Sequence, residues 1–144
     1  MQTQIEDPTR RKFLGLLAKL PLVPASMLVA HNVGKMLPPA PRKVLLNDFP
    51  IAGFKYYHGP SVHPSLHAGT ALHLRAEPGN PYDPHAVEIL RGGDKLGYVP
   101  RFCNRHLSRL LQAGVSLSCT VGQVNPMQPA WQAVQVRVSL LQAA

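Results

Sequence analysis

Residues 77–100, EPGNPYDPHAVEILRGGDKLGYVP, decide the fold of this chain. Three prolines fall within the first eight of these residues, from Glu77 to Pro84. Each proline fixes its own φ and pushes the residue before it toward an extended conformation, so the loop is stiff before any partner arrives. A stiff loop that exposes an Asn, a Tyr and an Asp loses little entropy on binding and therefore suits recognition.

The segments on either side of this loop alternate with the period of a β-strand. Ala86–Leu90 and Lys95–Val99 are predicted to pair as a hairpin across Gly92-Gly93-Asp94, because a glycine-rich turn between two apolar runs is typical of hairpins. The residues before the loop alternate from Ala71 to Glu77. Further strands are predicted over Phe49–Tyr57, Val115–Val124 and Trp131–Leu140.

A single convincing helix is predicted, from about Arg101 to Ala113. Leu107, Leu110 and Leu111 share one side of it, and Gly114 lies where a helix ends. Residues 58–69 are rich in Pro, Ser, His and Gly, which predicts a long loop. Five or six short strands with one inserted helix indicate a mainly β fold, a small and partly closed β-barrel.

Composition predicts one folded domain with a basic surface. Hydrophobic residues make up 45% of the 144 residues and charged residues only 15%, so most of the chain should fold. The formal net charge is +8, and the chain stays basic without its first 30 residues. Such a surface favours nucleic acid, anionic lipid or an acidic protein as partner, and charge alone does not choose among them.

The first 30 residues are predicted to be a targeting segment. The run Thr9-Arg10-Arg11-Lys12-Phe13-Leu14 resembles the twin-arginine export signal of bacteria. The apolar stretch that follows is interrupted by Lys19, Pro21 and Pro24, which argues against a membrane-spanning helix. We therefore expect an exported, periplasmic protein that contacts the membrane through this leader only. The alternative is a basic amphipathic helix that stays attached, either on a membrane surface or packed on the domain, in a cytoplasmic protein.

Residues 31–48 are predicted to form a linker. Pro38, Pro39 and Pro41 break any helix and favour an extended path. The short apolar run 44–46 could form a first edge strand or dock onto the core. Order is expected to begin near Phe49, so the folded domain is placed at residues 49–142.

Three motifs in order resemble one family. They are G-F-K-Y-Y at 53–57, E-P-x-N-P-Y-D-P-x-A-V at 77–87, and L-G-Y-V-P at 96–100 before a Leu-rich helix. Together they resemble the HIRAN domain, in a stand-alone bacterial form, over roughly residues 49–140. The resemblance implies a barrel related to OB and SH3-like folds that binds single-stranded DNA, notably a free 3′ end. It also implies a link to DNA repair, because HIRAN domains occur attached to repair helicases and nucleases.

The resemblance also implies site residues. Tyr56 and Tyr82 would hold the terminal base, and Asp83 would accept a hydrogen bond from the terminal 3′-hydroxyl. Stacking a base on an aromatic ring contributes about 1–3 kcal/mol without selecting a sequence. A carboxylate would repel an internal phosphodiester, so it distinguishes chain ends from chain middles. The full candidate set for nucleic-acid binding is Lys55, Tyr56, Asn80, Tyr82, Asp83, Tyr98 and Arg101, with Lys55 and Arg101 placed to meet phosphates.

Each assignment has a structural alternative. One of Tyr56 and Tyr57 should face the interior, because neighbours on a strand point oppositely. Asp83 could simply cap the following turn, as Asp commonly does. Tyr98 fits the core or the groove. Arg105 and Arg109 continue from Arg101 at helical spacing and could extend a basic stripe or form a solvated helix face.

No set of residues predicts catalysis. The chain has no Gly-rich phosphate loop, no paired carboxylates in an acid/base setting and no G-x-S-x-G. His58, His63 and His67 lie close together but match no zinc motif, so we expect no metal and no cofactor. Cys103 and Cys119 are expected as buried free thiols, with a disulfide as the alternative after export.

The sequence therefore predicts a non-enzymatic, monomeric module that binds single-stranded DNA at 3′-hydroxyl ends. The competing hypothesis is an exported interaction or structural domain that uses the same groove for a protein or cell-envelope ligand.

Overall fold

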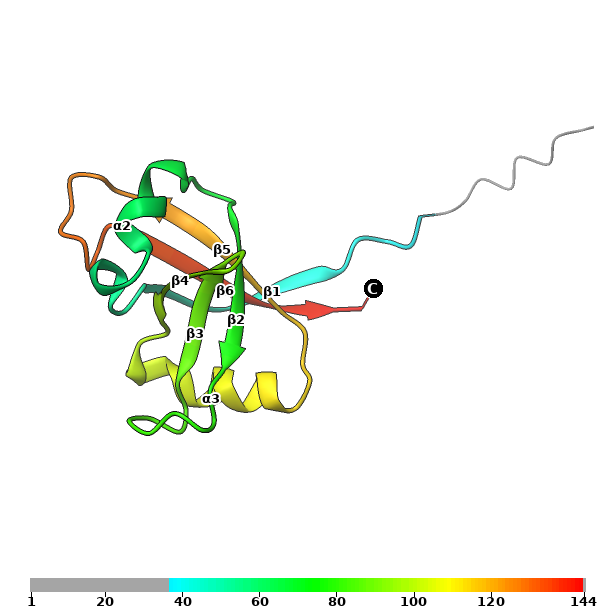
Figure 1. The fold of residues 1–144 in the computed structure, drawn as a ribbon. Coiled ribbons are helices and arrows are strands. Elements are labelled where there is room, and N and C mark those ends of the chain that lie inside the picture. The colour runs from blue at the N-terminus through cyan, green and yellow to red at the C-terminus, as the bar shows by residue number, and fades with distance from the viewer. Residues whose placement is uncertain (1–36, 144) are drawn as a thin grey trace, which may run out of the picture. The chain divides into compact units, whose positions relative to one another are not determined.

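The computed structural model describes residues 37–143, and in this part of the chain six antiparallel strands build the fold (Figure 1). Their order across the sheet is β1-β6-β5-β2-β3-β4. The predicted mainly β fold is confirmed. The strands are β1 (Arg42–Pro50), β2 (Ala71–Ala76), β3 (Val87–Arg91), β4 (Asp94–Tyr98), β5 (Leu117–Val124) and β6 (Val134–Gln142).

The two outer strands of this order, β1 and β4, are brought together where the chain leaves β1. The N–H of Ala52 donates to the carbonyl of Tyr98 at 2.9 Å, and the N–H of Tyr98 donates back to the carbonyl of Ala52 at 2.9 Å. Gly97 permits this approach, because a Cβ at that position would lie 2.3 Å from the Ala52 carbonyl oxygen. The sheet is therefore a partly closed barrel, as the sequence predicts, and the closure places Tyr98 beside Ala52.

Alternation along the strands fills the barrel interior. Val134, Val136 and Val138 of β6 are buried, as are Cys119 and Val121 of β5, which agrees with the period of two in the sequence. Residues between them point outward. The ladder is irregular near residues 46, 90 and 122, where the register shifts, and such bulges bend strands enough to close a small sheet.

The predicted hairpin and helix both form. β3 and β4 are joined by Gly92 and Gly93, and Gly92 has the positive φ of 58° that such a turn requires. The helix α3 (Arg101–Gln112) buries Leu107 completely against the sheet and ends before Gly114, whose φ is 77°. The α3 helix thus follows directly from the end of β4.

The stretch 49–57 differs from its prediction as one continuous strand. β1 ends at Pro50, and Gly53, with φ 74°, turns the chain into a 3-10 helix, Phe54–Tyr56. Phe54 is buried in the core and takes the inward position. The predicted loop 58–69 also contains a short helix, α2 (Gly59–Val62), and a second 3-10 turn, His63–Ser65.

Order also begins earlier than expected. Residues 42–48, which we expected to belong to the linker, form most of β1. This strand pairs with β6 from Arg42 opposite Gln142 to Pro50 opposite Gln135, so of the two alternatives for the run 44–46 the edge strand is correct. The reason is that β6 would otherwise leave its backbone groups unpaired along that edge. The leader and residues 31–36 of the linker lie outside the described residues. Within residues 37–143, no helix is long and apolar enough to cross a membrane.

Both cysteines are free and buried in the structure. Burial raises the pKa of Cys103 to about 11 and that of Cys119 to about 12. The thiols therefore stay protonated at neutral pH and act as core residues rather than nucleophiles.

Candidate functional site

A hollow of about 420 Å³ opens where the proline-rich loop meets the barrel closure and the start of α3. Its volume lies in the range of small-ligand sites. Of the predicted site residues, Lys55 and Tyr56 do not line it, whereas the others do. The lining consists of Ala52, Tyr57, Asn80, Pro81, Tyr82, Asp83, Ala86, Tyr98, Val99, Arg101 and Asn104.

The side chain of Asn80 shapes the loop. Its Oδ1 accepts hydrogen bonds from the backbone N–H groups of Tyr82 at 2.9 Å and Asp83 at 3.2 Å. Its Nδ2 donates to Oε2 of Glu77 at 2.9 Å. This pattern is the side-chain mimic of a backbone turn that Asn commonly forms. Asn80 therefore holds Tyr82 and Asp83 in place, which leaves its carbonyl oxygen little capacity for a ligand.

The carboxylate of Asp83 is divided between two tasks. Oδ1 accepts the backbone N–H of His85 at 2.8 Å, so the turn-capping alternative is correct for this oxygen. Oδ2 accepts Nδ2 of Asn104 at 2.7 Å and lies 3.7 Å from Nε of Arg101. The His85 N–H and, after it, the Asn104 amide and the Arg101 charge lower the pKa of Asp83 below its ordinary 3.8 against the effect of burial. An ionised carboxylate therefore lines the hollow at neutral pH.

Replacing Asn104 by Ala should raise the pKa of Asp83 toward 3.8, because the carboxylate loses one of its donors. A lowered pKa stabilises the fold above the unfolded-state value, and that stabilisation disappears as pH falls through the folded-state pKa. In Asn104→Ala the loss should therefore start at the same unfolded-state pKa, but it should be smaller and be complete at a higher pH than in the parent protein. A ¹³C NMR titration of the Asp83 carboxyl carbon measures the shift.

The control is Asn125→Ala, since Asn125 Oδ1 accepts only a loop N–H, that of Met127 at 3.1 Å. An Asp83 titration curve identical in Asn104→Ala and the parent would contradict the role given to this hydrogen bond.

Two tyrosine rings form the wall of the hollow. Tyr57 and Tyr98 meet edge to face, with ring centroids 5.8 Å apart. The ammonium of Lys95 lies 4.7 Å from the Tyr57 centroid and 4.1 Å from that of Tyr98. Lys95 also pairs with the buried carboxylate of Glu88 at 3.0 Å, and the Tyr98 hydroxyl donates to Oε2 of Glu77 at 3.0 Å. These interactions fix both rings before any ligand binds.

The charges behind this wall are permanent at neutral pH. Burial would lower the pKa of Lys95, but its hydrogen bond to Tyr98 and its pairing with Glu88 outweigh burial and raise that pKa. For Tyr98, burial itself raises the pKa, so the hydroxyl keeps its proton at neutral pH. The sequence allowed Tyr98 to belong to the core or to the groove, and the structure shows features of both. Its ring lines the hollow, while its hydroxyl donates a hydrogen bond to Glu77 behind the hollow.

At the mouth, two predicted residues are free to meet a ligand. Tyr82 is 87% exposed, and the guanidinium of Arg101 donates to the Tyr82 carbonyl at 3.4 Å. Tyr56 is 74% exposed but is not among the residues that line the hollow, and the Lys55 ammonium lies 4.8 Å from the centroid of its ring. Of the predicted site residues, those of the proline-rich loop thus lie with Tyr98 and Arg101 around the hollow. Lys55 and Tyr56 are not part of its lining.

Of the lining residues with polar side chains, sequence reasoning missed two. Tyr57 was missed because a strand over 49–57 would force one tyrosine inward. Instead the 3-10 helix ends at Tyr56, Tyr57 follows it, both tyrosines are exposed and Phe54 is inside. Asn104 was missed because it is a buried polar residue of α3, and the family motifs end before it at Pro100. Its position near one helical turn after Arg101, beside the loop, is the signal that points to it.

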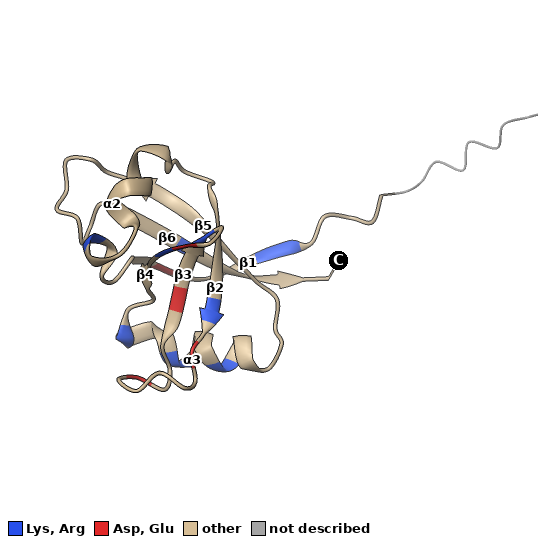
Figure 2. Cartoon of the chain, viewed as in Figure 1, with Lys and Arg blue, Asp and Glu red and all other residues tan. Residues whose placement is uncertain are grey.

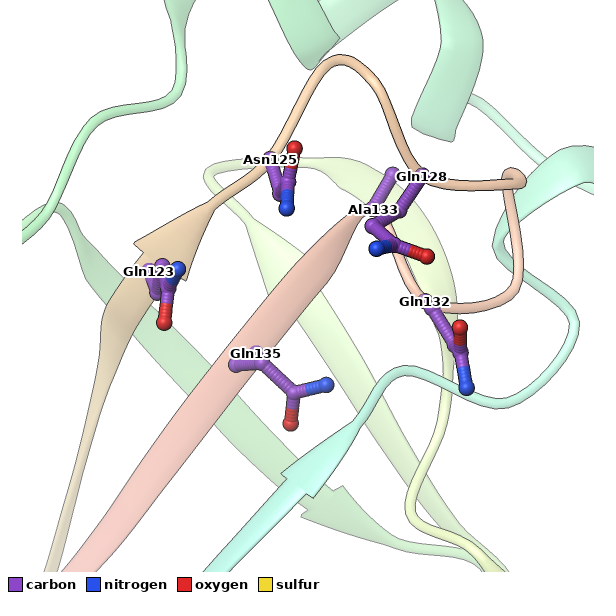
Figure 3. A pocket seen from close by; sticks show the side chains of 6 residues that line it. All are labelled: Gln123, Asn125, Gln128, Gln132, Ala133 and Gln135. Carbon is purple, nitrogen blue, oxygen red and sulfur yellow. The ribbon is translucent and has the colours of Figure 1, made fainter.

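A second hollow, of about 230 Å³, lies where β5 ends and β6 begins, beside the loop that connects them (Figure 3). Figure 3 shows Gln123 and Gln135 projecting from neighbouring strands and Gln128 and Gln132 from the connecting loop. Its lining has carboxamides but neither an aromatic ring nor a charge. It therefore lacks the groups that hold a base or a phosphate. Among residues 37–143, no three His, Cys, Asp or Glu side chains are grouped to bind a metal ion.

Comparison with known proteins gives a family match and a shared fold. The family model described as the HIRAN domain matches residues 45–141. The structure is similar to that of a protein from Lactobacillus plantarum, with a TM-score of 0.61 and 25% identity over 71% of this chain and 98% of the other. It also shares the fold of the HIRAN domain of human HLTF, with a TM-score of 0.52 and 18% identity over 68% and 78% of the two chains. No curated protein sequence matches.

Proposed function

The chain belongs to the HIRAN domain family, and from this premise we propose that it binds single-stranded DNA at a free 3′-hydroxyl end without catalysing a reaction. HIRAN domains are nucleic-acid-binding modules. One observation supports the choice of a strand end. The ionised carboxylate of Asp83 lies in a hollow between an exposed tyrosine, Tyr82, and an arginine, Arg101.

The terminal base would stack in the hollow. Tyr82 offers a free ring face on the loop side, and the wall formed by Tyr57 and Tyr98 lies on the barrel side. Stacking tolerates every base, which suits recognition of an end rather than a sequence. Tyr56, which the family resemblance places in this role, is next to Tyr57 in the chain and is proposed as an outer aromatic partner, with Lys55 meeting a phosphate.

The 3′-hydroxyl would donate a hydrogen bond to Oδ2 of Asp83. A carboxylate accepts such a bond strongly but repels a phosphate at the same position. Arg101 supplies the opposite charge at the mouth, where it would meet the last phosphate between nucleotides. The pair of charges therefore orients the end: hydroxyl toward Asp83, backbone toward Arg101.

The lining supports binding rather than catalysis. Asp83 is the one carboxylate among the residues that line the hollow, so no second carboxylate is present to share acid/base work. Its pKa is lowered, which makes it a poor proton donor at neutral pH. The carboxylate is therefore assigned to recognition.

Oligonucleotides of one sequence that end in 3′-hydroxyl or 3′-phosphate test the proposal. At one stated salt concentration, the hydroxyl end should bind about tenfold more tightly, since a partly exposed hydrogen bond to a charged group contributes roughly 1.4 kcal/mol. Asp83→Asn should remove most of this difference. Fluorescence anisotropy measures both affinities. Equal affinities of the parent protein for the two ends would contradict the assignment of Asp83.

The second candidate is an exported domain that uses the same hollow for a protein or cell-envelope ligand. The run Thr9–Leu14 favours it, because an exported protein seldom meets DNA. Cell fractionation separates the two functions: a mature chain in the periplasm supports the second candidate, and a full-length cytoplasmic chain supports DNA binding.

A further inference from the structure

We propose that the exposed face of α3 binds the part of the strand that lies 5′ to the terminal dinucleotide. Phe102, Arg105 and Arg109 form this surface, called the α3 track below. The inference rests on the proposed function, because the track continues from the hollow that receives the 3′ end.

The geometry of α3 makes the track continuous with the hollow. Arg101 and Asn104, in the first turn, line the hollow. Phe102, Arg105 and Arg109 follow at i+3 and i+4 spacing, so they share one side of the helix. From Arg101 to Arg109 this side extends about 12 Å, at roughly 1.5 Å per residue.

The exposure of the track is not explained by packing. Phe102 is 79% exposed, whereas Cys103 and Leu107 on the other side of α3 belong to the core. A large aromatic ring in water contributes little to folding. On a nucleic-acid surface the same ring is a platform for an unpaired base.

The charge of α3 has one sign. The helix contains three arginines and no Asp or Glu, and Figure 2 shows its cationic positions recurring along its length. Within residues 37–143, neither Arg105 nor Arg109 forms an ion pair, while Arg75, Arg101 and Arg137 each pair with a carboxylate. Cations in the first turns of a helix oppose its dipole, so Arg101 and Arg105 do not stabilise α3. The charges of the track therefore remain available for phosphates.

These features match a single strand better than other anionic partners. A flexible single strand can place bases on an exposed ring and phosphates on neighbouring cations at once. The competing path leaves the hollow past Lys55 and Tyr56, which also join a cation to an exposed ring. The two paths lie on different elements, so variants separate them.

The test compares a 3′-hydroxyl dinucleotide with a 3′-hydroxyl 12-mer on the full chain. The double variant Arg105→Gln/Arg109→Gln should bind the dinucleotide like the parent protein. For the 12-mer, the negative slope of log K against log salt should become shallower by about 1.4. Each phosphate that an arginine neutralises on a single strand contributes about 0.7 to this slope, and the variant removes two arginines. Phe102→Ala should weaken the 12-mer about fivefold or more and spare the dinucleotide.

The matched control is Arg42→Gln/Lys43→Gln, which removes the same charge from the exposed start of β1. An equal fall of the salt slope in this control, or no fall in the α3 double variant, overturns the inference. So does a result in which Lys55→Gln weakens binding of the 12-mer while the α3 double variant and Phe102→Ala leave it unchanged. Failure of the proposed function appears differently, as a parent protein that shows no preference for a 3′-hydroxyl over a 3′-phosphate at either length.

Discussion

A Tyr82→Ala variant should bind a 3′-hydroxyl oligonucleotide about 5- to 150-fold more weakly than the parent protein. The loss follows from removing one face of the base stack, which contributes about 1–3 kcal/mol. The melting temperature should not change, because Tyr82 is 87% exposed and its ring supports nothing in the core. Fluorescence anisotropy gives the affinity, and circular dichroism gives the melting temperature.

Tyr57→Ala and Tyr56→Ala are the matched comparisons. Tyr57 lines the hollow and Tyr56 does not, so the Tyr57 variant should lose more affinity than the Tyr56 variant. A folded Tyr82→Ala protein with parental affinity would remove the stacking role. A greater loss at Tyr56 than at Tyr57 would show that the base lies outside the hollow.

Phe54→Ala should lower the free energy of unfolding by about 3–5 kcal/mol. Phe54 is buried in the core, meets the His63 ring edge to face at 6.0 Å, and lies so close to Gly59 that a Cβ there would be 2.6 Å from its ring. The loss is a large share of the total stability of a small domain. Urea denaturation measures it.

Phe102→Ala is the control, since it removes the same side chain from an exposed position. If the two variants lost similar stability, Phe54 would not anchor the turn that precedes Tyr57. Phe54→Leu should retain enough stability to show whether loosening this turn also weakens DNA binding.

The sequence predicts the local structure well where one short-range rule applies. Alternation gives β2, β5 and β6, the Gly92-Gly93 pair gives the β3–β4 hairpin, and Gly114 gives the end of α3. The barrel was predicted from the number and length of these elements.

Long-range pairing explains what the sequence does not reveal. The apolar run 44–46 allows an edge strand, but only pairing with β6 decides that β1 begins at Arg42. In the same way, Gly53 lies inside the segment Phe49–Tyr57 that the sequence predicts as one strand. Its positive φ instead ends the extended chain and turns Phe54 inward.

In the candidate site, too, the sequence predicts the local arrangement and not the long-range contacts. Tyr82 and Asp83 lie in one stiff loop, so the motif predicts their proximity directly. Asn104 and Tyr57 join them only through the docking of α3 and through the Ala52–Tyr98 closure, which are tertiary interactions. Asn80 was predicted as a ligand-binding residue, but its hydrogen bonds to the backbone of Tyr82 and Asp83 explain its place in the motif, because they hold the loop together.

The most direct measurement of the central claim is an NMR titration of the ¹⁵N-labelled chain with a 3′-hydroxyl single strand. The account predicts the largest amide shifts at Tyr82, Asp83 and Tyr98 and across residues 101–104, around the hollow beside Asp83. Largest shifts at residues 123–135, around the carboxamide-lined hollow, with none near Asp83, would contradict it.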